Sequence, residues 1–158
     1  MLVLLDSTPL RMVTYAVVRS EIGECNEWLE QLLINDVPVL VPEIIDYELR
    51  RELIRTDNFD AIEFLNKLAA DIGYLKLNSE TYQIAASLWA SVRKKGQPTA
   101  GDERLDIDCL LAAQARQVST IPPFHNDQIR IATGDSDLPR FDHGRVRAQH
   151  WRDIKPTP

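Results

Sequence analysis

The chain has 158 residues, of which 44% are hydrophobic, so it is long enough for one good core and too short for two domains of ordinary size. Its formal net charge of -6 at pH 7 argues against a protein that coats nucleic acid, because that mode of binding needs a broadly basic face. We therefore predict a single domain over residues 1–155, followed by a frayed C-terminus at residues 156–158.

The first predicted strand is the aliphatic run Leu2–Leu5, which ends at Asp6 with no basic residue before it. Such a run is typical of a strand buried on both faces, and ligands of open α/β sheets bind where strands end, so Asp6 stands at a functional position. A turn residue or a plain helix cap is the alternative for Asp6. The N-terminal run lacks the basic region of a signal peptide, and no stretch of the chain approaches the roughly 20 apolar residues of a membrane span. Because the two cysteines also read as free thiols, we expect a cytoplasmic protein in a reducing compartment.

A second strand is predicted over residues 37–42, and a helix begins at Glu43. Within this helix Glu48 lies one turn from Ile44 and Ile45, so we expect its side chain to be half-buried. The alternative is a surface glutamate that pairs with Arg51.

The other predicted elements follow from hydrophobic periodicity and from Gly and Pro breaks. Helices are expected over residues 10–18, 22–34, 59–70 and 79–95, strands over 72–77 and 129–133, and loops over 97–104 and 118–128. Trp151 and Ile154 are expected to add an edge strand or to pack on the sheet. Cys25 and Cys109 lie in apolar helical patterns without the spacing of a zinc site, which predicts buried free thiols.

The small-residue stretch from Leu105 to Ala115 reads as a helix, with Asp106 as its N-cap and Asp108 in its first turn. Together with the other elements it predicts a parallel sheet covered by helices on two faces. Asp6 and Asp135 would then end two strands, and Asp108 would begin a helix at the same edge. Carboxylates this close repel one another unless a cation neutralises them, and oxygen ligands suit Mg²⁺ or Mn²⁺.

Four short motifs resemble, in order, those of the PIN-domain ribonucleases that act as VapC-like toxins of type II toxin–antitoxin pairs. The resemblance spans nearly the whole chain, and its third motif is the most specific. The motifs are Leu4-Leu5-Asp6-Ser7-Thr8, Ile44–Arg50 around Glu48, Asp108–Ala115, and Thr133–Leu138 around Asp135. This resemblance implies a PIN-like three-layer α/β/α fold with a central, mostly parallel sheet of four or five strands.

The resemblance also implies an activity, which is metal-dependent hydrolysis of RNA phosphodiester bonds. Asp6, Glu48, Asp108 and Asp135 would be the catalytic residues and would hold Mg²⁺ or Mn²⁺, with Asp6 and Asp108 as direct ligands. The implied partners are an RNA substrate, a cognate antitoxin protein and a second copy of the chain. Apolar anchors for such a homodimer are available at Phe64, Leu88 and Trp89.

Two assignments stay open at the level of sequence. Asp106 could replace Asp108, and Asp137 could replace Asp135. The alternative function is a non-catalytic PIN-like module that binds RNA or protein. A domain that accepts phosphate on Asp6 is a third reading, but it would need a second acid where Thr8 stands.

Overall fold

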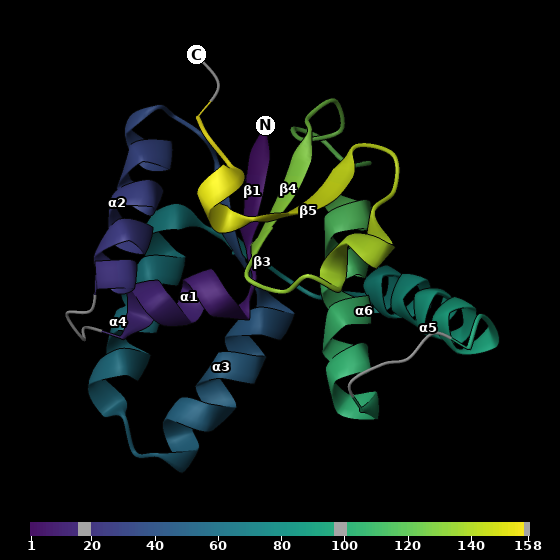
Figure 1. Cartoon of the computed structure of the whole chain (residues 1–158), viewed down its shortest axis with the longest axis horizontal. Coiled ribbons are helices and arrows are strands. Elements are labelled where there is room, and N and C mark those ends of the chain that lie inside the picture. The colour runs from purple at the N-terminus through teal and green to yellow at the C-terminus, as the bar shows by residue number, and fades with distance from the viewer. Residues whose placement is uncertain (16–19, 97–100, 157–158) are drawn as a thin grey trace.

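The computed structural model describes residues 1–15, 20–96 and 101–156, and its centre is one parallel β-sheet (Figure 1). The strand order is β3-β2-β1-β4-β5, and every neighbouring pair runs parallel. The strands are β1 (Leu2–Leu5), β2 (Val39–Pro42), β3 (Tyr74–Leu75), β4 (Ile129–Thr133) and β5 (Val146–His150). The predicted α/β class is confirmed, with five strands in the sheet.

Strand β1 forms the centre of the sheet because it is hydrophobic along its whole length. Its residues Leu2–Leu5 are completely buried, as expected for a strand covered on both faces. Val3 pairs with Val39 of β2, and Leu2 pairs with Ile129 of β4. This register brings the C-terminal ends of β1 and β4 to one edge of the sheet.

Helices surround the sheet in two groups, which Figure 1 shows with α1 to α4 on the left and α5 and α6 on the right. Their buried faces close a single hydrophobic cluster around the sheet. The helices are α1 (Ser7–Thr14), α2 (Ser20–Ile34), α3 (Glu43–Arg55), α4 (Phe59–Ile72), α5 (Ser79–Lys94) and α6 (Asp102–Val118), with short 3-10 helices η1 (Leu138–Phe141) and η2 (Trp151–Asp153).

Helix α6 begins earlier than predicted, and this corrects the expected role of Asp106. The helix starts at Asp102, and Gly101 takes the N-cap position with a φ of 67°. Asp102 and Glu103 place their charges in the first turn, where the helix dipole favours acids. Asp106 is therefore an exposed residue inside the helix and not its N-cap, and Asp108 lies in the second turn.

Residues 97–100 of the predicted loop, like residues 16–18 of the first predicted helix, lie outside the described ranges.

The C-terminal region also differs from the expected edge strand near Trp151. The edge strand β5 ends at His150, and Trp151 opens η2 instead. The buried Trp151 ring lies 5.7 Å from the ring of Trp28 in α2. The Trp28 Nε1–H donates a hydrogen bond of 2.9 Å to the carbonyl of Ile154, which is also buried. Both residues thus pack against the fold, which was the other expectation.

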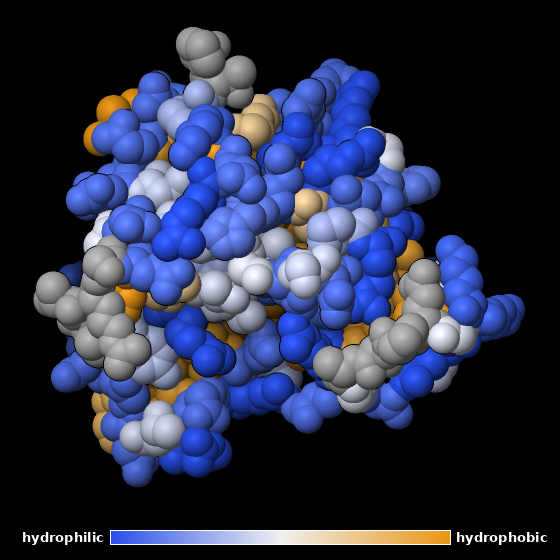
Figure 2. Space-filling model, viewed as in Figure 1, coloured by the Kyte–Doolittle hydropathy of each residue, from blue (hydrophilic) through white to orange (hydrophobic). Residues whose placement is uncertain are grey.

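Two further features concern the interior and the surface of the protein. Cys25 and Cys109 are buried free thiols, as predicted. The face seen in Figure 2 is largely hydrophilic, and hydrophobic residues reach it in small separate groups. Within the part of the chain that the structure describes, no helix is both long enough and apolar enough to cross a bilayer.

Candidate functional site

A cleft of about 580 Å³ opens where β1 and β4 end, and all four predicted acids line it. The acids come from four different elements or their ends, which explains why they are far apart in sequence. They are Asp6 after β1, Glu48 of α3, Asp108 of α6 and Asp135 after β4. Asp106 and Asp137 do not line this cleft.

Asp6 is fixed in the cleft by two hydrogen bonds. Its Oδ1 accepts one of 2.7 Å from the Ser7 N–H, so Asp6 is the N-cap of α1 as well as a cleft residue. Its Oδ2 accepts one of 2.6 Å from the Thr133 hydroxyl of β4. Burial raises the pKa of Asp6, the bond from Thr133 opposes this, and the Asp135 charge raises it further.

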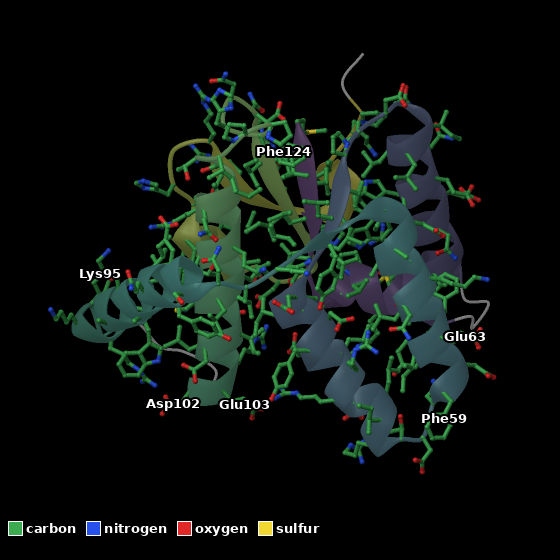
Figure 3. All side chains as sticks on the ribbon, turned by 180° about the vertical axis from the view of Figure 1, so that it is seen from behind. Phe59, Glu63, Lys95, Asp102, Glu103 and Phe124 are labelled. Atoms are coloured by element: carbon green, nitrogen blue, oxygen red, sulfur yellow. The ribbon has the colours of Figure 1, made fainter. Side chains whose placement is uncertain are left out.

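Glu48 is half-buried, as its position beside Ile44 and Ile45 predicted. Burial is the main reason that the pKa of Glu48 is raised, and repulsion by Asp6 adds to it. The alternative of a surface pair with Arg51 is not what the structure shows. Arg51 instead bonds to Glu103 across the cleft, at 2.6 Å. In Figure 3, Glu103 lies at the end of α6 on the side that faces α3.

Asp108 of α6 carries a negative charge that its surroundings disfavour. Burial, followed by repulsion from Asp6 and Asp135, raises the pKa of Asp108 to about 7. Asp106 lies outside the cleft and lines a groove between α5 and α6 together with Tyr82 and Trp89. The structure therefore places Asp108 with the other acids and Asp106 outside them.

Asp135 forms an ion pair with Arg104, which lies in the first turn of α6. Its Oδ1 also accepts a hydrogen bond of 2.8 Å from the Asp137 N–H. Partial burial favours protonation of Asp135, but these two contacts outweigh it and lower the pKa of Asp135. Asp137 is exposed and lies 3.4 Å from Arg140, away from the cleft.

The turn after β4 needs a glycine at the point where it passes α1. A Cβ on Gly134 would lie 2.8 Å from the Thr8 Cγ2, which is closer than such atoms approach. The Thr133 hydroxyl accepts a hydrogen bond of 2.8 Å from the Asp135 N–H while it donates to Asp6. One hydroxyl thus ties the acid after β1 to the acid after β4.

The donor chemistry of the cleft fits a hard divalent cation. Its acids offer only oxygen ligands, and burial together with mutual repulsion raises the pKa of three of them. In residues 1–15, 20–96 and 101–156, however, no three His, Cys, Asp or Glu side chains already converge as a metal cage. Asp135 is held by Arg104.

The sequence does not predict the ion pairs Arg104–Asp135 and Arg51–Glu103 of the cleft. Both Glu103 and Arg104 fall in the loop that the sequence predicts over residues 97–104. Their positions in the first turn of α6, on the side facing α3 and β4, could be found only once the start of that helix was known.

No protein-family model and no curated protein sequence matches the chain. Solved structures do match its fold. One match is a chain in the crystal structure of VapBC2 from Rickettsia felis bound to a DNA fragment from the VapBC2 promoter. It superposes with a TM-score of 0.67 at 13% sequence identity, over 96% of this chain and 99% of that one. A chain of VapBC-1 from nontypeable Haemophilus influenzae superposes with a TM-score of 0.63 at 17% sequence identity, over 97% of this chain and 100% of that one.

A chain of FitAcB from Neisseria gonorrhoeae gives a TM-score of 0.61 at 18% identity, over 96% of this chain and 99% of that one. At such low identities the likeness concerns the fold. The similarity covers nearly the whole chain in each case, just as the sequence motifs did. The chain therefore has the PIN-like α/β fold that its four motifs indicated, shared with chains of these VapBC and FitAcB structures.

Proposed function

We propose that the protein is a metal-dependent endoribonuclease that hydrolyses RNA phosphodiester bonds. The observation that carries this proposal is the cleft in which Asp6, Glu48, Asp108 and Asp135 lie together at the C-terminal edge of the sheet. These are the acids of the four motifs that resemble PIN-domain ribonucleases. Open α/β sheets bind their ligands at this edge.

Asp6 and Asp108 would hold Mg²⁺ or Mn²⁺ directly, with Glu48 and Asp135 completing the acidic surround. When bound, such an ion lowers the pKa of a water molecule and offsets the charge that develops on the phosphate. Thr133 and the Ser7 N–H orient the Asp6 carboxylate through their hydrogen bonds. Their role is to keep the ligand oxygens in place while the cleft binds substrate.

We further propose that the protein is the toxin of a VapBC-type pair. Support comes from its fold, which it shares with chains of VapBC2, VapBC-1 and FitAcB. A cognate antitoxin would then be its partner. The net charge of -6 favours a partner segment that is basic where it approaches the acidic cleft.

The direct test is cleavage of RNA by the purified protein, freed of any partner. We expect cleavage only with Mg²⁺ or Mn²⁺, and EDTA should stop it. Restoration by an excess of Mg²⁺ is the control that separates metal removal from damage. Cleavage that continues in EDTA would contradict the proposal, and RNA binding without cleavage under any metal would favour the non-catalytic module.

We also expect a homodimer in solution, built on exposed aromatic side chains. Trp89 is 37% exposed and lines the groove between α5 and α6 together with Tyr82. Light scattering should give about twice the chain mass of 18.0 kDa. Trp89→Ser should shift the mass toward that of one chain, because aromatic anchors dominate interface energies.

Phe59→Ser is the matched control for this experiment. Phe59 is 68% exposed and thus more exposed than Trp89. Figure 3 shows it at the start of α4, on the side of the molecule away from α5. A single-chain mass for the unaltered protein at micromolar concentration would contradict the dimer. Equal effects of the two substitutions would place the interface elsewhere.

A further inference from the structure

Arg104 is positioned as a counterion for the whole acidic cleft. It is ion-paired with Asp135, and its positive charge partly offsets the rise in pKa that burial causes at Asp6, Glu48 and Asp108. Arg51, the other arginine that lines the cleft, bonds to Glu103 instead of to any of the four acids. Arg104 is therefore the arginine in direct contact with one of the four acids, while Arg51 and Arg140 act on them from further away.

The two members of the Arg104–Asp135 pair differ in how firmly they are held. The Asp135 side chain is only 15% exposed, and its backbone and carboxylate are fixed by bonds of 2.8 Å to Thr133 and Asp137. The Arg104 side chain is 54% exposed and reaches Asp135 from the solvent side. When the pair breaks, the long and exposed arginine is therefore the member that moves, while the acid stays where it is.

We propose that Arg104 is a resident counterion that competes with the divalent cation for Asp135 and sets the metal affinity of the cleft. This inference rests on the metal site of the proposed function. Binding of the metal requires Asp135 to exchange a charge-assisted bond with Arg104 for the cation. The arginine then swings to the mouth of the cleft, and the apparent affinity for metal is lowered by the cost of breaking the pair.

The test measures binding of Mn²⁺ to the metal-stripped protein by calorimetry or electron paramagnetic resonance, without RNA. Arg104→Gln should bind Mn²⁺ about tenfold more tightly than the unaltered protein, because no pair has to be broken. Arg104→Lys keeps the charge but loses the planar fork, so its affinity should lie between the two. Thermal unfolding of each variant checks that it is folded.

Arg51→Gln is the matched control, since it removes the same charge from the same cleft without freeing one of the four acids. It should change the Mn²⁺ affinity by less than about threefold. If Arg104→Gln and Arg51→Gln tighten binding equally, the effect is one of general charge and the competition is overturned. If neither the unaltered protein nor Arg104→Gln binds Mn²⁺, the metal site of the proposed function fails instead.

Discussion

The substitution Asp108→Asn is expected to lower the rate of RNA cleavage by at least about a hundredfold while the protein stays folded. It keeps the size of the side chain but removes a charge that lies among the other cleft acids. Asp6→Asn, Glu48→Gln and Asp135→Asn should act in the same direction, because each removes a ligand or the charge that holds one. Initial rates on one RNA substrate, at saturating Mg²⁺, would measure the series.

Asp57→Asn is the control for this series. Asp57 is an exposed residue just after α3 with a φ of 51°, a conformation that asparagine tolerates as well as aspartate does. The Asp57→Asn variant should cleave RNA at the same rate as the unaltered protein. If the four cleft variants cleaved RNA at the rate of this control, the activity would belong to a contaminant or to another site.

Asp108→Asn should also stabilise the metal-free protein above neutral pH, although we expect it to slow RNA cleavage. The folded-state pKa of Asp108, about 7, lies above its ordinary value of 3.8. Folding is therefore penalised as the pH rises from about 4 to 7, because the folded protein must give up a proton that it binds more tightly than the unfolded chain does. The penalty is absent at lower pH and complete above about pH 7.

Thermal unfolding in EDTA at pH 5 and pH 8 would measure this effect. The gain for Asp108→Asn at pH 8 should be on the order of 2 kcal/mol, after allowance for solvent screening, or roughly 4–8 °C in Tm. At pH 5 the gain should be only roughly a third of that at pH 8, because pH 5 lies about one unit above the ordinary pKa of 3.8 in a window of about three units. Excess Mn²⁺ at pH 8 should reverse the order, because only the unaltered protein gains a full set of ligands. A gain that is equal at both pH values would show that charge is not its cause.

The sequence predicts the environment of a site residue correctly where that environment is determined by residues nearby in the chain. The unbroken run Leu2–Leu5 predicts a buried central strand, and the strand end then places Asp6. Glu48 was expected to be half-buried because Ile44 and Ile45 lie one turn away on the same helix. In each case neighbours within one helical turn, or within one strand, determine the environment.

The start of α6 could not be predicted because its signal is ambiguous. Acids suit a helix N-terminus at Asp102 and Glu103 as well as at Asp106, and nothing within one turn distinguishes these starts. The pairing of Arg104 with Asp135, 31 residues apart, depends on how α6 docks beside β4. Such contacts are decided by tertiary packing, which local patterns do not contain.

The strand order has a consequence for how the protein is made. The first strand, β1, pairs with β4, which is more than a hundred residues further along the chain. A growing chain that has not yet reached residue 129 therefore has an unpaired β1 edge, and Asp6 lacks its bond from Thr133. Such long-range pairing is slow, because the loop must close before the contact can form. The cleft can thus be completed only late in synthesis, and a chain cut short before residue 129 lacks both the strand that pairs with β1 and one of the four acids.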